Sequence, residues 1–122
     1  MWCILLRILA SLTVLHGLAT LVAARLLPLS AIGDRLLFAQ HGFAFIFLAL
    51  LNLVIWQEPA RGWMARIILH GCNAVFCGFY VAMAVHHSEP PNWTAVVLVA
   101  GMTLVGLAQE LSARSRSRNS TT

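Results

Sequence analysis

Lysine is absent from this chain of 122 residues, and the acidic residues are only four in number. Charged residues make up 10% of the sequence, against about a quarter in ordinary soluble domains, while hydrophobic residues make up 60%. A soluble domain of this size cannot hide so much apolar surface from water, so we expect a lipid bilayer to surround it. No basic face with interleaved aromatic residues is present, which argues against a nucleic-acid partner.

The scarcity of charge leaves four long uncharged runs, and each is close to the roughly 20 residues that an α-helix needs to cross a bilayer. Tryptophan, which prefers the headgroup level of a membrane, stands at the edges of these runs. Its four positions are Trp2, Trp56, Trp63 and Trp93. The runs are residues 8–24, 36–57, 67–88 and 90–109, and with their edges they predict membrane spans at about 4–26, 36–56, 64–87 and 92–111.

Short connections rich in proline, glycine and serine separate the four predicted helices. Short connections make consecutive helices antiparallel neighbours. The sequence therefore predicts an all-α integral membrane protein, a four-helix up-down-up-down bundle over residues 1–111. The segment 112–122 alternates serine with arginine and then becomes wholly polar, so we expect a disordered cytoplasmic tail.

The arginines predict the orientation of this bundle. With both termini in the cytoplasm, six arginines lie inside, and only Arg25 and Arg35 lie outside. The six inside are Arg7, Arg61, Arg66, Arg114, Arg116 and Arg118. The use of arginine alone as the basic residue is typical of GC-rich bacterial genomes, so we expect a multi-pass protein of the bacterial plasma (inner) membrane.

Several classes of function lack the residues that they need. All four acidic residues, Asp34, Glu58, Glu89 and Glu110, stand at the ends of the predicted spans, whereas proton-coupled transporters usually carry a carboxylate within the membrane. No nucleophile–base–acid set, phosphate-binding loop or recognised metal-ligand spacing is present, so we expect neither an enzyme nor a metal site. The three cysteines are expected to be small packing residues.

Polar residues inside the predicted spans are the natural candidates for function. The third span carries them at helical spacing on one face, beside a second face of small residues that favours close approach of another helix. We therefore predict a helix-packing face of Gly71, Ala74, Gly78 and Ala82 on the third span, which we place at the centre of the bundle. The predicted interior polar residues include Asn52, Asn73, Cys77 and Tyr80.

Intramembrane histidines raise the alternative of a bound haem b, whose iron two facing imidazoles at similar depth would hold. Counted at 1.5 Å per residue, His16 lies ~13 Å from Arg7, and His70 lies ~10 Å from Trp63. The pair His16 and His70 is thus the candidate ligand set, and His41 is a weaker one. If the first span begins at Trp2 instead, His16 lies several ångströms deeper.

Three hypotheses follow from the sequence. The first is a non-enzymatic accessory subunit or homo-oligomer that acts through helix packing, with other membrane subunits or its own copies as partners. The second is a haem-binding membrane redox protein, and the third is an oligomeric transporter of small solutes or ions. The intramembrane polar groups also have a plain structural interpretation, in which they hydrogen-bond across helices.

Overall fold

The computed structural model describes residues 1–26, 32–57, 62–86 and 90–119. Within these ranges the chain forms four helices and no strand: α1 (Trp2–Leu26), α2 (Ile32–Gln57), α3 (Trp63–His86) and α4 (Pro90–Asn119). Each helix contains a stretch that is long and apolar enough to cross a membrane. The prediction of an all-helical chain with four such helices is confirmed.

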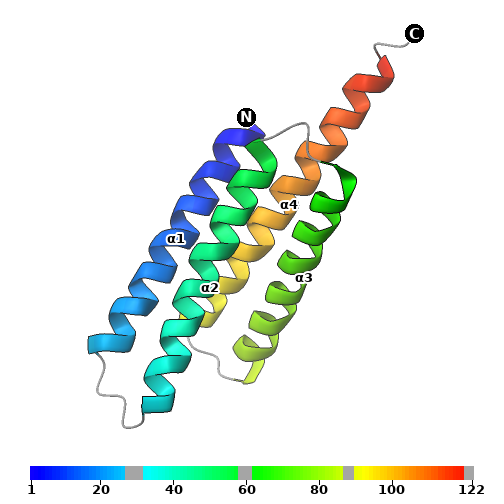
Figure 1. Ribbon diagram of the computed structural model, residues 1–122. Coiled ribbons are helices and arrows are strands. Elements are labelled where there is room, and N and C mark those ends of the chain that lie inside the picture. The colour runs from blue at the N-terminus through cyan, green and yellow to red at the C-terminus, as the bar shows by residue number, and fades with distance from the viewer. Residues whose placement is uncertain (27–31, 58–61, 87–89, 120–122) are drawn as a thin grey trace.

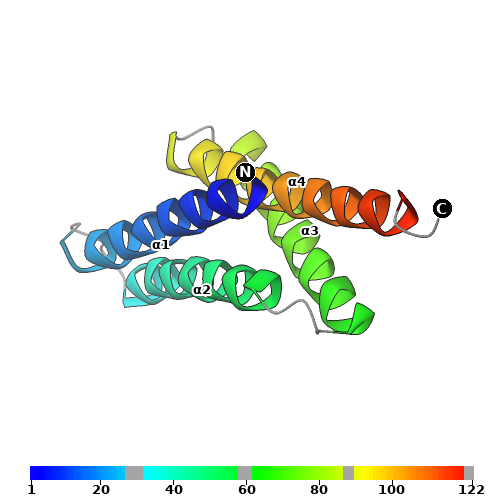
Figure 2. The same cartoon turned by 90° about the horizontal axis from the view of Figure 1, so that it is seen from above.

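Consecutive helices run in opposite directions along the bundle (Figure 1). The helix α1 packs most extensively against α2, while α4 packs against both α1 and α3. The contact between α2 and α3 is the smallest of these four, and the view from above shows α3 inclined away from α2 (Figure 2). The bundle is therefore tightly closed between α1 and α2 and more open between α2 and α3.

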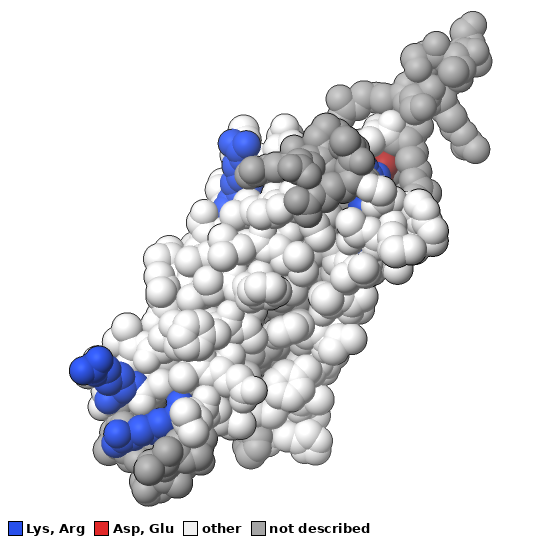
Figure 3. Space-filling model, viewed as in Figure 1, with Lys and Arg blue, Asp and Glu red and all other residues white. Residues whose placement is uncertain are grey.

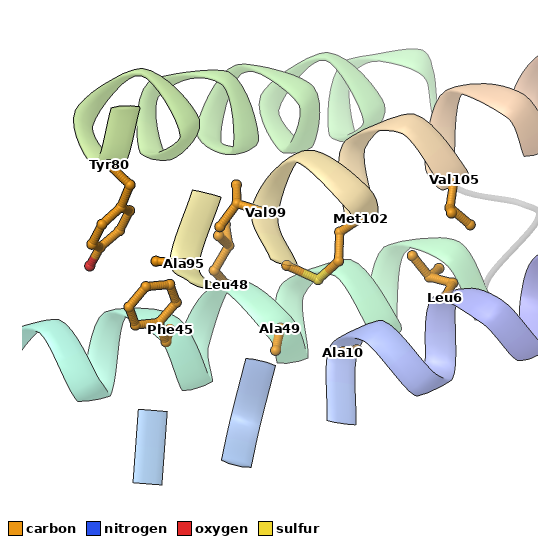
Figure 4. Close-up of a cluster of buried hydrophobic side chains, with 10 residues drawn as sticks. All are labelled: Leu6, Ala10, Phe45, Leu48, Ala49, Tyr80, Ala95, Val99, Met102 and Val105. Carbon is orange, nitrogen blue, oxygen red and sulfur yellow. The ribbon is translucent and has the colours of Figure 1, made fainter. Parts of the chain in front are cut away.

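All four helices contribute to the core (Figure 4). Small residues such as Ala10, Ala49 and Ala95, each at most 1% exposed, let the helices approach, and larger side chains fill the space between them. Because interiors of this kind are packed without large voids, a change of even one methylene in them is felt. The ten residues of this cluster are Leu6, Ala10, Phe45, Leu48, Ala49, Tyr80, Ala95, Val99, Met102 and Val105.

The outer surface of the bundle is also apolar. Phe47 and Val75, for example, expose 71% and 72% of their area, and the charged side chains seen in the space-filling view lie toward the two ends of the bundle (Figure 3). A soluble protein rarely exposes an apolar patch of this extent. The surface is therefore suited to a lipid environment around the middle of the helices.

The fourth helix begins and ends for different physical reasons. Pro90 and Pro91 occupy its first turn, where the backbone N–H that proline lacks would have no helical partner in any case. At its other end, α4 continues to Asn119, whereas the sequence predicts a disordered tail from residue 112. Adding a residue to an existing helix costs far less than starting one, and alanine and arginine are good helix formers.

Candidate functional site

The hydroxyl groups of the bundle are mostly bound within their own helices. Five hydroxyl groups donate to the backbone carbonyl four residues earlier, at 2.8–3.0 Å: those of Thr13, Thr20, Thr94, Thr103 and Ser112. This bond satisfies the hydroxyl without a second helix. These side chains therefore do little to hold one helix to another, apart from a longer contact of 3.8 Å between Thr13 Oγ1 and Met102 Sδ.

One pair of amides does join two helices. Asn52 on α2 and Asn73 on α3 each donate from Nδ2 to the Oδ1 of the other at 3.0 Å, and Asn52 also donates to the Leu48 carbonyl at 2.8 Å. Both side chains are buried, at 0% and 1% exposure. The pair lies where α2 and α3 otherwise make few contacts, so it fixes the relative position of these two helices. Both residues were predicted to lie in the interior.

Nearer the start of α2, side chains from all four helices surround a cavity of about 200 Å³, which we call the His41 chamber. Its walls are rich in rings, and among the described residues that line it there is no arginine and no carboxylate. The lining residues are His16 and Thr20 from α1, Leu37, Phe38, His41 and Phe45 from α2, Tyr80 and Met83 from α3, and Pro91 and Asn92 from α4.

Ring contacts hold the side chains of this chamber in place. The His16 ring meets Phe45 edge-on, with centroids 4.8 Å apart, and Phe45 stacks on Tyr80 at 4.7 Å. The His41 ring stacks on Phe79 at 5.8 Å, and its Nδ1 lies 2.7 Å from the Leu37 carbonyl oxygen. Because a carbonyl only accepts, His41 Nδ1 carries the proton when the ring is neutral, and Nε2 is left as an acceptor.

Tyr80 is the least satisfied residue of the chamber. Its side chain is only 4% exposed, yet its hydroxyl has no hydrogen-bond partner among the described residues. The ring reaches from α3 toward Phe45, and the hydroxyl points away from the remainder of the apolar cluster (Figure 4). A buried polar group without a partner costs about 1–3 kcal/mol. Tyr80 therefore presents a donor that a ligand can satisfy.

The structure does not bring His16 and His70 together. The His16 ring lies against Phe45, whereas the His70 ring lies against Trp56, with centroids 5.8 Å apart. Phe45 and Trp56 are separated by eleven positions on α2, which corresponds to about 16 Å along the helix. His16 and His70 therefore lie at different depths in the bundle, and the prediction that their depths are similar is wrong. Since α1 begins at Trp2, His16 lies farther along the bundle than a count from Arg7 suggests.

A second cluster of polar side chains, Arg66, His70 and Glu110, lies at the opposite end of the bundle from the chamber. This cluster was not predicted from the sequence. Glu110 Oε1 lies 3.5 Å from His70 Nε2 and 4.0 Å from Arg66 Nη1. The Glu110 side chain is only 12% exposed. Two further buried polar atoms nearby, Trp56 Nε1 and Gln109 Oε1, have no hydrogen-bond partner among the described residues. The spacing of Arg66 and His70, four apart on α3, was the available signal, because such residues share one helix face.

The predicted packing face of α3 lies on the outside of the bundle. Gly71, Ala74, Gly78 and Ala82 are all exposed. A Cβ atom built on Gly71 or Gly78 would meet no atom within 4 Å. Within the described ranges, the face therefore packs against none of the other three helices, and α3 is not the central helix. Cys77, predicted to be interior, is half-buried.

Close packing within the bundle occurs instead between α1 and α2. A Cβ atom on Gly17 would lie 2.7 Å from the Gly42 carbonyl oxygen, and one on Gly42 would lie 2.7 Å from the Gly17 carbonyl oxygen. Glycine is needed at both positions because the two backbones touch. Each glycine directly follows a histidine of the chamber, so the crossing sets the places of His16 and His41.

No group of three or more histidine, cysteine or acidic side chains comes together as a metal site within the described part of the chain. No curated protein and no solved structure matches the sequence. The model of one protein family matches residues 47–121, which run from the second half of α2 through α3 and α4 and contain Asn52, Asn73, Tyr80 and Glu110. The match covers more than half of the chain, so the protein belongs to this family of unknown function, DUF8011.

Proposed function

We propose that the protein is a non-enzymatic, multi-pass protein of the bacterial inner membrane that acts by packing α3 against a helix of another subunit. Its own copies are the first partner to consider. One observation carries this proposal: the small residues of α3 are exposed on the outside of the bundle, although they are the type that membrane helices use for close contacts.

The chain itself illustrates what such a face does when it is occupied. At Gly17 and Gly42 the backbones of α1 and α2 touch, with the built Cβ positions only 2.7 Å from the facing carbonyl oxygen. On α3, Gly71 and Gly78 have the same small size but open space above them. In a bilayer, where apolar burial provides no force between helices, close van der Waals contact is the main gain of association. An unoccupied face of this kind favours assembly.

Disulfide cross-linking in native membranes tests the proposal. In a chain with its three native cysteines replaced, an Ala74→Cys variant should form a covalent dimer on mild oxidation, because Ala74 lies in the middle of the face. A Leu15→Cys variant is the matched control, since Leu15 is exposed on α1 at a similar distance from the start of its helix. Equal cross-linking of the two variants would indicate random collision in the membrane and would contradict the proposal.

A bulky residue on the face provides the second arm of the test. Gly78→Leu should abolish the Ala74→Cys cross-link without unfolding the monomer, because nothing in the bundle lies within 4 Å of its built Cβ atom. Ala19→Leu makes a similar enlargement on an exposed position of α1 and should leave the cross-link unchanged. If Ala74→Cys joins only to a different protein, the accessory-subunit form of the proposal stands and the homo-oligomer form fails.

A further inference from the structure

The His41 chamber adjoins the opening between α2 and α3. A second cavity of about 300 Å³ shares His41 and Tyr80 with the chamber. It also shares Ala44 and Phe76 with a third cavity of about 550 Å³ that is almost wholly apolar. We call these two cavities together the α2–α3 groove. A path of apolar walls thus leads from the outside of the bundle to the His41–Tyr80 pair.

From this arrangement we propose that the protein binds an isoprenoid quinone, with the quinone ring in the His41 chamber and the apolar tail in the α2–α3 groove. The proposal concerns binding alone, and it does not depend on whether the protein forms oligomers. It rests on three properties of the site: the size and ring-lined walls of the chamber, its hydrogen-bonding groups, and its position beside the groove.

The size and walls of the chamber select a single ring. Drug-sized ligands and cofactors occupy cavities of about 300–1,000 Å³, so a chamber of about 200 Å³ suits one six-membered ring with its substituents rather than a larger ring system. Phe38, Phe45 and Tyr80 provide aromatic surfaces for stacking. The described lining residues include no arginine and no carboxylate to hold a charged headgroup, which favours an uncharged ring over a phospholipid headgroup.

The hydrogen-bonding groups match a ring that carries oxygen atoms. The Tyr80 hydroxyl is buried, has no hydrogen-bond partner among the described residues, and can donate to a carbonyl oxygen of the ligand. His16 offers a second N–H in its neutral form, while His41 Nε2 is an acceptor because Nδ1 faces the Leu37 carbonyl. Donors suit the two carbonyls of a quinone, and the acceptor suits the hydroxyl of the reduced quinol.

The groove accounts for the tail. It is lined by side chains such as Ala44, Phe47, Leu51 and Phe76, and the lateral opening exists because α2 and α3 make few contacts beyond the Asn52–Asn73 pair. A free quinone headgroup without a tail would leave this surface to ordinary lipid. The position of the ring-lined chamber beside an open apolar groove, with His41 and Tyr80 lining both, is what favours a long-tailed ligand.

The test is a binding titration of the full-length protein in detergent, followed by native mass spectrometry. The probe is decylubiquinone, and decylbenzene serves as a ligand with the same tail but no carbonyl oxygens. Because detergent solvates both tails alike, a difference between the two ligands reports on the headgroup. We expect wild-type protein to bind one decylubiquinone and to bind decylbenzene at least several-fold more weakly.

Variants locate the site. Tyr80→Phe keeps the ring contacts and removes only the hydroxyl, so it should weaken decylubiquinone about fivefold, as expected for the loss of one hydrogen bond. Thr103→Val removes a hydroxyl outside the chamber, bound to the Val99 carbonyl, and should leave the affinity unchanged. Ala44→Phe fills the groove and should reduce the gain in affinity that a ten-carbon tail gives over a tail-less ubiquinone.

The proposal is overturned if wild-type protein binds the two probes equally, since the site would then be a plain apolar groove. It is also overturned if Tyr80→Phe binds decylubiquinone as tightly as wild type. Retention of phospholipid in the purified protein, with no displacement by decylubiquinone, would assign the groove to a lipid instead. Circular dichroism and the thermal midpoint of each variant establish that any loss of binding does not come from unfolding.

Discussion

Asn52 and Asn73 carry the only direct side-chain hydrogen bonds between α2 and α3 in the described part of the chain. Their mutual bonds satisfy one donor and one acceptor on each amide, and in an apolar interior no water replaces a lost partner. Polar pairs between membrane helices average about 0.6 kcal/mol, because the unfolded chain also finds partners. The pair also sets the relative position of α2 and α3, since these two helices are otherwise loosely packed.

The loss of unfolding free energy in the double variant should therefore be smaller than the sum of the losses in the two single variants. Asn52→Leu leaves the buried Asn73 amide unpaired, and we expect a loss of about 1–3 kcal/mol in the free energy of unfolding. In the double variant with Asn73→Leu no orphaned amide remains, so the loss should be smaller than the sum of the two single losses. Unfolding titrations in mixed micelles, arranged as a double-mutant cycle, measure the difference. Strictly additive losses would contradict a direct interaction.

At the scale of helices, two kinds of glycine behave in opposite ways. Gly17 and Gly42 lie where α1 and α2 touch, while Gly71 and Gly78 of α3 face open space. The same residue type thus marks an occupied contact in one pair of helices and an unoccupied face in another. The spacing of small residues in the sequence indicated only the face on α3, which repeats along one helix. The contact at Gly17 and Gly42 joins two single glycines on different helices, so no repeated pattern marks it.

The change in unfolding free energy should consequently have opposite signs for Gly17→Ala and Gly71→Ala. The new Cβ atom at position 17 would lie 2.7 Å from the Gly42 carbonyl oxygen and 2.8 Å from Ile46 Cγ1, so α1 and α2 must separate. We expect a loss of about 1–3 kcal/mol in unfolding free energy from this overpacking. The matched change at position 71 meets nothing and should gain up to about 1 kcal/mol, since alanine favours the helix over glycine. Unfolding midpoints of the two variants in the same detergent provide the comparison, and equal midpoints would refute the assigned contact.

For the whole molecule, the start of α1 and the end of α4 lie toward the same end of the bundle (Figure 1). This is the arrangement that an even number of crossings requires. In the predicted up-down topology, six arginines of the sequence fall on the side of the termini and two on the other side, which favours the cytoplasm for the termini. The acidic residues carry little weight in this rule.

Reporter fusions expressed in a bacterium test the proposed orientation. Green fluorescent protein joined to either terminus should fluoresce, because it folds in the cytoplasm. Alkaline phosphatase inserted after residue 88, in the third connection, should be active, because it needs the oxidising periplasm. Active phosphatase at the C-terminus would reverse the orientation and would exchange the sides to which the His41 chamber and Glu110 lie nearest.

The sequence by itself determined the number and the type of the helices and, except at the end of α4, their approximate limits. Those features depend on local chemistry: uncharged runs of membrane length, and prolines and charges at their ends. It also indicated that Asn52, Asn73 and Tyr80 lie inside, because each is a polar residue within an apolar run. The sequence does not predict the helical extension of α4 to Asn119, since a polar segment has no apolar periodicity that would indicate a helix.

The rotation and relative depth of the helices were decided only by tertiary structure. A helix that is apolar on nearly every side has no single face that must point inward, so its pattern leaves the rotation open. This is why the small face of α3 was placed in the centre when it lies outside, and why His16 was paired with His70. Packing of backbone against backbone at Gly17 and Gly42 instead places His16 and His41 around one chamber with Tyr80.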